Sequence, residues 1–66
     1  MSKNSIVESL DFAEVLARDA RADGMKFVEK GNKAAGSRAR LHLAALANLC
    51  KQVRADIQEK KNAEKK

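Results

Sequence analysis

Basic residues gather around a glycine and an asparagine in the middle of the chain. Five of them fall between positions 26 and 40, where Glu29 is the only acid: Lys26, Lys30, Lys33, Arg38 and Arg40. Ammonium and guanidinium groups bind phosphate, and the free amides at a helix start attract anions as well. Gly31 and Gly36 leave the backbone uncovered, and the Ser37 hydroxyl adds a donor. The segment therefore predicts a phosphate-binding joint.

More basic residues continue beyond this segment. Lys33, Arg40 and Arg54 follow a seven-residue rhythm, and Lys51 lies close to Arg54 in the sequence. In a helix these side chains lie on the face away from the apolar stripe, where a phosphate backbone can run along them. Aromatic residues make up only 3% of the chain, so base stacking of the kind used by single-strand binders is not expected. A basic surface that is merely solvated is the open alternative.

Residues that carry catalysis or bind metals are nearly absent. His42 is the single histidine and Cys50 the single cysteine, and neither has partners at metal-ligand spacing. Cys50 falls in an apolar stripe, so we expect a buried, inert thiol. The chain also lacks a glycine-rich phosphate loop, a paired-carboxylate site and a Ser-His-Asp set. We therefore expect no enzyme activity, no metal, no cofactor and no small-molecule substrate.

Size and composition bound the architecture. The chain has 66 residues, a net charge of +5 and one cysteine, so it forms one domain at most and no internal disulfide. A monomer of this size is marginally stable, and we expect oligomerisation to supply the missing core. No secretory signal begins the chain, and no run reaches the roughly 18 apolar residues of a membrane span. We therefore expect a soluble, cytoplasmic protein with no membrane partner.

Apolar spacing predicts two helices, over residues 5–30 and 33–62. In the first, apolar or small residues recur at steps of three and four: Ile6, Leu10, Ala13, Ala17, Ala20, Gly24 and Phe27. In the second, the same steps connect Ala35, Ala39, Leu43, Leu46, Cys50, Val53 and Ile57. Ser5 and Asn32 are the predicted N-caps, and Gly31 is the predicted left-handed cap between the helices. Residues 63–66 are expected to form a basic disordered tail.

A joint of two residues, 31–32, predicts that the helices fold back as an antiparallel hairpin. Both apolar stripes are wide, and two helices cannot cover them. We therefore expect an all-α fold in which two hairpins dimerise into a four-helix bundle. The residues predicted for the core and the dimer contact are Leu10, Leu16, Phe27, Leu43, Leu46, Val53 and Ile57. Gly24 is expected to allow close approach by a partner helix, with a local break of the helix as the alternative.

Charge divides unevenly between the two parts of the chain. Residues 1–24 carry a net charge of −2, and residues 25–66 carry a net charge of +7. We expect the first part to act as a mildly acidic scaffold and the second part to meet an anionic partner.

The segment 29–40 also carries a recognisable signature. It contains Glu-Lys-Gly-Asn-Lys-Ala-Ala, a short step and then Arg-Ala-Arg. This resembles the bacterial linker-histone-like nucleoid proteins of the chlamydial histone-one-like family, and residues 54–62 are similar to that family as well. The resemblance implies a small, basic nucleoid protein that binds DNA without sequence specificity. It places six residues in the motif: Lys30, Asn32, Lys33, Ser37, Arg38 and Arg40.

The chain departs from this family in two places. It ends with a short basic segment at Lys66 where the family has long Lys/Ala-rich tails, and residues 41–46 are more apolar than usual. We therefore expect the folded joint, multiplied by oligomerisation, to carry the DNA contacts.

The predicted function is that of a histone-like, nucleoid-associated protein. As a homodimer or higher oligomer, it would compact, bend or bridge double-stranded DNA through phosphate contacts. The residues predicted to touch DNA are Lys26, Lys30, Asn32, Lys33, Ser37, Arg38, Arg40, Lys51 and Arg54. The alternative is a small helical protein-interaction module that binds no nucleic acid.

Overall fold

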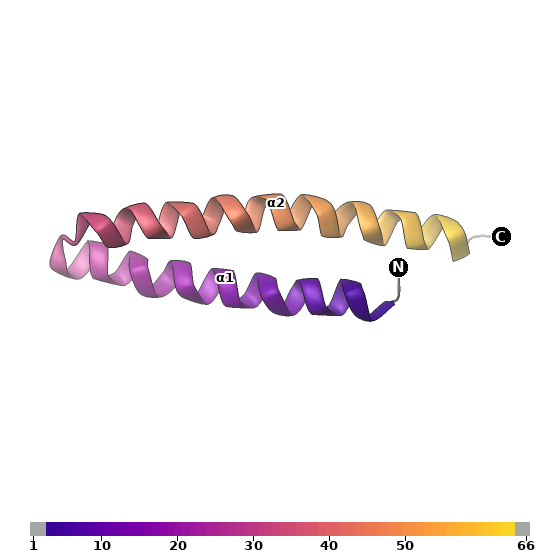
Figure 1. Ribbon diagram of the computed structural model, residues 1–66, viewed down its shortest axis with the longest axis horizontal. Helices are drawn as coiled ribbons and strands as arrows, with labels where there is room; N and C mark the ends of the chain where they lie inside the picture. Colours follow the sequence, from indigo (N-terminus) through magenta and orange to yellow (C-terminus); the bar gives the residue numbers. More distant parts are fainter. Residues whose placement is uncertain (1–2, 65–66) are drawn as a thin grey trace.

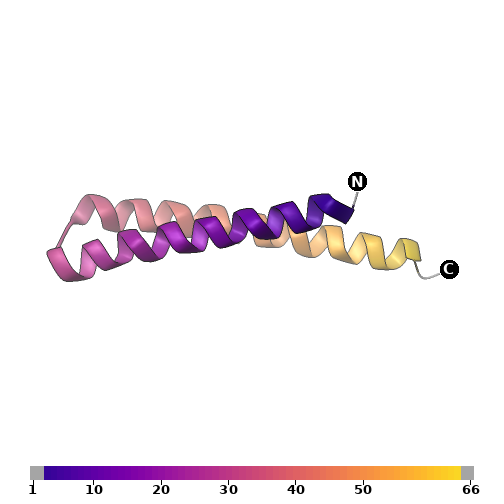
Figure 2. The ribbon, with the colours of Figure 1, turned by 90° about the horizontal axis from the view of Figure 1, so that it is seen from below.

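The computed structural model describes residues 3–64 as two α-helices, α1 (Lys3–Lys30) and α2 (Lys33–Glu64), which lie side by side (Figure 1). Residues 31–32 join them, so the helices run antiparallel and form a hairpin about 54 Å long and 15 by 13 Å across. Seen from below, they cross at a shallow angle (Figure 2). The prediction of an all-helical fold with two packed helices is confirmed.

Local sequence explains the long, unbroken helices. The chain has no proline, and α1 continues without a break through Gly24. The predicted N-cap at Ser5 is wrong, because Ser5 lies inside α1. At the other end α2 extends to Glu64, whose carboxylate lies 2.8 Å from Nζ of Lys60 one turn earlier. Ala63 and Glu64 are therefore helical, although a disordered tail was expected there, and residues 65–66 lie outside the described part of the chain.

The turn between the helices is closed by backbone and side-chain caps. Gly31 has φ +65°, and its N–H donates to the carbonyl of Phe27 at 3.0 Å, which is the left-handed helix cap. Oδ1 of Asn32 accepts a bond of 3.1 Å from the N–H of Ala35, at the third position of α2. The predicted roles of Gly31 and Asn32 as caps are confirmed.

A thin seam of side chains holds the two helices together. On α1 the buried or half-buried positions include Ile6, Ser9, Ala13, Leu16, Ala20 and Asp23. On α2 they include Ala35, Ala39, His42, Leu46, Leu49, Val53 and Asp56. These positions alternate steps of three and four, so they are the a and d rows of a heptad pattern.

This seam differs from the predicted stripes by one row. The predicted stripes contain the a row, to which Ala13 and Val53 belong, together with the e row, which lies four residues after each a position. The large apolar side chains of the e row are exposed in the hairpin: Leu10 is 47% exposed, Leu43 53% and Ile57 40%. Cys50 is in the same row and is exposed, so the expectation of a buried thiol is wrong for the single hairpin. The physical reason is that the d rows mix apolar residues such as Leu16 and Leu49 with polar ones, of which Asp23 and His42 contact each other across the seam, so the rows are not visible as an apolar stripe.

Phe27 packs closely against α2 beside the turn. Phe27, although 47% exposed, lies over Gly36, where an added Cβ would be only 2.8 Å from Cδ1 of the ring. No comparable approach exists at Gly24, where a Cβ would meet nothing within 4 Å. The close helix approach expected at Gly24 is therefore absent within the hairpin.

Candidate nucleic-acid interface

The turn brings together cations from both helices. Lys26 and Lys30 end α1, Lys33 begins α2, and Arg40 follows two turns later. All four side chains are exposed, and Asn32 and Ser37 lie among them and are exposed as well. We call Lys26, Lys30, Lys33 and Arg40 the turn cluster.

Arg38 has a different role from its neighbours. Its Nε and Nη2 donate to Oδ1 of Asp23 on α1, at 3.3 and 3.2 Å. Nε2 of His42 lies 3.3 Å from the other carboxylate oxygen, Oδ2. Asp23 is only 8% exposed, so these three residues form a polar clasp across the seam. The sequence predicts Arg38 as a DNA contact, and the structure adds that it ties α2 to α1.

The clasp depends on an ionised carboxylate. The hydrogen bond from Arg38 lowers the pKa of Asp23 below its ordinary value of 3.8. Burial acts in the opposite direction, while the positive charges of Arg38, His42 and Lys26 lower the pKa further. Asp23 is therefore negative at neutral pH and offsets the Arg38 charge. The spacing of Asp23, three residues after Ala20 and four before Phe27, is compatible with the seam, but the spacing of Gly24 is equally compatible.

The turn cluster has no internal carboxylate partner. Among the side chains described, ion pairs join Arg38 to Asp23, His42 to Asp23 and Lys60 to Glu64, and none involves the turn cluster. An arriving phosphate therefore displaces only water and counterions from these four cations. Arg40 also lines an open hollow of about 370 Å³ on the outer side of α2, together with Ser37, Leu41 and Ala44.

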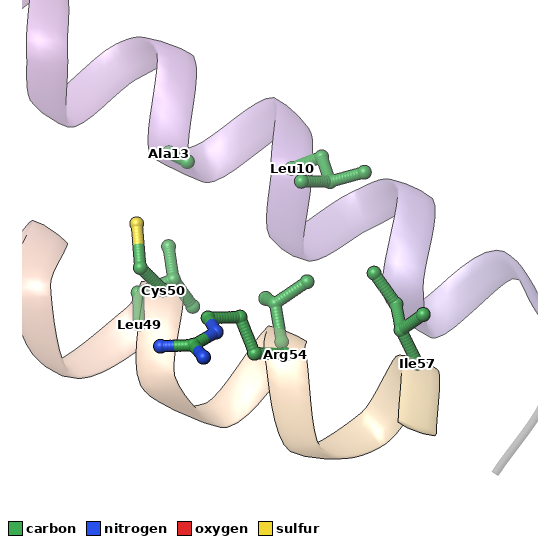
Figure 3. Close-up of a pocket in the computed structure, with 7 residues that line it drawn as sticks. Leu10, Ala13, Leu49, Cys50, Arg54 and Ile57 are labelled. Carbon is green, nitrogen blue, oxygen red and sulfur yellow. The ribbon is translucent and has the colours of Figure 1, made fainter. Parts of the chain in front are cut away.

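Lys51 and Arg54 lie apart from the turn cluster. Lys51 is about 27 Å from Lys33 along α2, at 1.5 Å per residue. Arg54 lies beside an apolar hollow of about 270 Å³ near the open end of the hairpin, which Leu10, Cys50 and Ile57 also line (Figure 3). The nine predicted contact residues thus divide into a group at the turn and a pair farther along α2.

The described residues contain no cluster of metal-ligating side chains and no membrane-spanning helix. No three His, Cys, Asp or Glu side chains of that part of the chain come together in a way that suits a metal ion. Neither described helix has an apolar stretch long enough to cross a lipid bilayer.

Comparison with family models decides which proteins this hairpin is related to. Residues 14–63 match the family described as histone H1-like protein Hc1. The chain belongs to the Hc1 family. Hc1 proteins are histone-like, DNA-binding structural proteins, so the resemblance seen in the signature segment is confirmed. No curated protein and no solved structure matches the chain.

The Hc1 match contains most of α1 and nearly all of α2. It includes the turn cluster, the polar clasp, Lys51 and Arg54. It begins just after the hollow's Leu10 and Ala13, so the first turns of α1 lie outside the matched part.

Proposed function

We propose that this Hc1-family chain binds double-stranded DNA through its phosphate backbone, without reading sequence. The observation that carries the proposal is the turn cluster, four exposed cations from two helices that form no ion pair with a described carboxylate. Contacts to phosphate position a protein on DNA but carry no base information. With few aromatic residues and no extended loop, the hairpin has little with which to read or stack bases.

The start of α2 strengthens the cluster. The first amides of a helix point outward, and the helix dipole places about half a positive charge at this end. Asn32 caps only the amide of Ala35, so the amides of Lys33 and Ala34 are free to meet a phosphate oxygen. Gly31 has no side chain to block that approach. Asn32 and Ser37 supply neutral donors, and Lys51 and Arg54 are two further cations, separate from the cluster and farther along α2.

We also propose that the chain acts as a homodimer that forms a four-helix bundle. A single hairpin buries few apolar side chains (Leu16, Ala35 and Val53), while ten large apolar residues are at least 39% exposed. Pairing of hairpins removes part of this surface from water and gives each particle two turn clusters. Two clusters per particle allow it to bridge, bend or compact DNA.

The salt dependence of binding tests the DNA contacts. Each neutralised phosphate contributes about −0.9 to the slope of log affinity against log salt, so six contacts predict a slope near −5. We expect the double variant Lys33→Ala/Arg40→Ala to bind random duplex more weakly and to reduce the slope to about −3.5. Mobility-shift or anisotropy titrations between low and physiological salt measure both values.

A matched control separates local contacts from net charge. The variant Arg18→Ala/Lys61→Ala also removes one arginine and one lysine, but from exposed positions outside the turn cluster. It should keep a steeper slope and tighter binding than the turn-cluster variant. If the two variants bind alike, the turn cluster is not the site. If the folded chain binds no duplex at low salt, the proposal fails. The alternative function, a protein-interaction module that binds no nucleic acid, would then be favoured.

A further inference from the structure

Arg38 is bonded to a carboxylate inside the hairpin and is still open to solvent. The two partners of this ion pair differ sharply in exposure: 49% of the Arg38 side chain is open to solvent, but only 11% of the Asp23 side chain. An anion that approaches from outside therefore meets the guanidinium before it meets the carboxylate. Arg38 can be contacted by such an anion while it stays bonded to Asp23.

The bonds to Asp23 use only one edge of the guanidinium. Nε and Nη2 of Arg38 both donate to Oδ1, at 3.3 and 3.2 Å. A guanidinium has five N–H groups, of which two belong to Nη1 and two to Nη2. No hydrogen bond among residues 3–64 uses Nη1. The outer edge, formed by Nη1 and the second hydrogen of Nη2, is therefore the fork that suits two oxygens of one phosphate.

The carboxylate beneath Arg38 is engaged at both oxygens. Oδ1 of Asp23 accepts from Arg38, and Oδ2 lies 3.3 Å from Nε2 of His42. Since both contacts come from α2, the carboxylate on α1 has little freedom to turn, and it holds the guanidinium in one orientation. A surface arginine otherwise loses much of its rotamer freedom when it binds a ligand. Here that freedom is already reduced in the fold, so binding of a phosphate requires less ordering.

A second cation lies near this edge. Lys26 is one turn closer to the joint than Asp23 on α1, and its charge is near enough to lower the pKa of the Asp23 carboxyl. Arg38 comes from α2, so a phosphate bound here would contact both helices. Two positive charges and one negative charge leave the group of Lys26, Arg38 and Asp23 with a net charge of +1. The site therefore attracts anions although its carboxylate is ionised.

We propose that Asp23 is a positioning residue for DNA binding, because it holds Arg38 so that the outer edge of the guanidinium and the ammonium of Lys26 bind one phosphate of the duplex together. The proposal rests on the proposed function and deepens it, since it assigns an acidic residue a favourable role in binding DNA. The opposite role is that Asp23 neutralises Arg38 and withholds it from DNA. The two roles predict opposite changes in affinity when the carboxylate is removed.

The sizes of two effects decide the expected sign. A phosphate on the outer edge would lie about 8 Å from the Asp23 carboxylate, across the guanidinium. Repulsion over that distance in water weakens binding about twofold. One phosphate contact contributes about −0.9 to the salt slope, which is about eightfold in affinity at 0.1 M salt relative to 1 M. Loss of the Arg38 contact therefore outweighs relief of the repulsion, and removal of the carboxylate should weaken binding about fourfold.

Titration of a random duplex with the full-length chain, from low to physiological salt, measures this change. Asp23→Ala should weaken binding about fourfold at 0.1 M salt and make the slope less steep by about 0.9, although the variant raises the net charge of the chain. Asp19→Ala is the matched control, because Asp19 lies one turn earlier on α1, is exposed and forms no ion pair among the described side chains. It should bind as well as the native chain or up to about twofold more tightly, with an unchanged slope.

A double-mutant cycle with Arg38→Ala separates positioning from folding. In the Arg38→Ala background the contact is already absent, so Asp23→Ala should no longer weaken binding and should tighten it by up to about twofold. A purely structural role would weaken binding with or without Arg38. Far-UV circular dichroism in the same buffer shows that each variant is folded. If one is not, Asp23→Asn or Arg38→Gln, which keep a polar group in the clasp, takes its place, and the changes should have the same sign and a smaller size.

The outcomes decide the role of Asp23. Weaker binding and a flatter slope for Asp23→Ala, seen only when Arg38 is present, support the proposal. Tighter or unchanged binding, equal weakening without Arg38, or the same weakening in Asp19→Ala overturns it. The native chain is titrated alongside the variants. If the native chain binds no duplex, the proposed function itself fails, whereas native binding together with any of the contrary results refutes only the role of Asp23.

Discussion

The contact between Phe27 and Gly36 decides how closely the helices approach beside the turn, and one substitution tests it. Gly36→Ala adds a methyl group inside α2, where alanine is favoured over glycine by about 1 kcal/mol. The new Cβ would lie 2.8 Å from Cδ1 of Phe27 and 3.1 Å from Cγ, well inside the usual 3.5–4.0 Å between carbon atoms. The propensity gain and the steric clash therefore oppose each other.

The structure indicates which effect is larger. Cγ is the fixed end of the ring, so the ring cannot avoid the methyl by moving only its tip, and the side chain or the helices must shift. Overpacking of this kind costs about 1–3 kcal/mol. We expect Gly36→Ala to be neutral or destabilising by up to about 2 kcal/mol in the native chain. In a Phe27→Ala background the clash is gone, and the same substitution should stabilise by about 1 kcal/mol.

Urea unfolding followed by far-UV circular dichroism, at one chain concentration, measures all four proteins of this double-mutant cycle. The expected coupling energy is about 1–3 kcal/mol. Gly24→Ala is the matched control, because a Cβ there meets no atom within 4 Å and its coupling to Phe27 should vanish. Independent sites add to within about 0.5 kcal/mol, so a coupling below that value for Gly36 would show that the ring does not hold the turn.

Two further predictions concern the cap and the clasp. Asn32→Ala removes the bond to the amide of Ala35 and should lower the unfolding free energy by about 1 kcal/mol, measured by urea unfolding; Asn32→Asp, which keeps the acceptor, should retain most of it. The pKa of Asp23 is lowered in the fold, so its contribution is complete above its ordinary value of 3.8 and disappears as the pH falls through the lowered pKa. The native chain should therefore be more stable than Asp23→Asn at neutral pH, and the difference should shrink in acid below that value; a difference that is constant with pH would contradict the role of the charge.

Local features of the hairpin are predictable because they depend on near neighbours in the chain. Gly31 follows a long helical pattern and tolerates the positive φ, and Asn32 has the short acceptor that a helix start requires, so the joint is readable in advance. Ser5 shows the limit of the same reasoning. It has the right residue type for a cap, but the helix continues past it toward Lys3, and a capping residue by itself does not decide where a helix begins.

The seam is harder to predict because its d rows contain polar as well as apolar residues. A pattern search for apolar residues connects Leu10, Leu43 and Ile57, since nothing in the sequence shows that Asp23 finds Arg38 and His42 fifteen and nineteen residues away. Once these groups pair, the polar row can be buried and the apolar e row is left outside. Because of this pairing, each helix turns its a and d rows toward the other helix, where the sequence pattern predicted the a and e rows.

The sequence by itself determined the two helices, the joint, the uneven charge and the family signature, because each depends on residue type and short-range spacing. Only the tertiary structure decided which faces meet, that Arg38 is tied to Asp23 while the turn cluster forms no ion pair among the described residues, and that Cys50 is exposed. The physical reason is that helix formation is local, whereas the rotation of one helix against another depends on contacts between residues far apart in the chain.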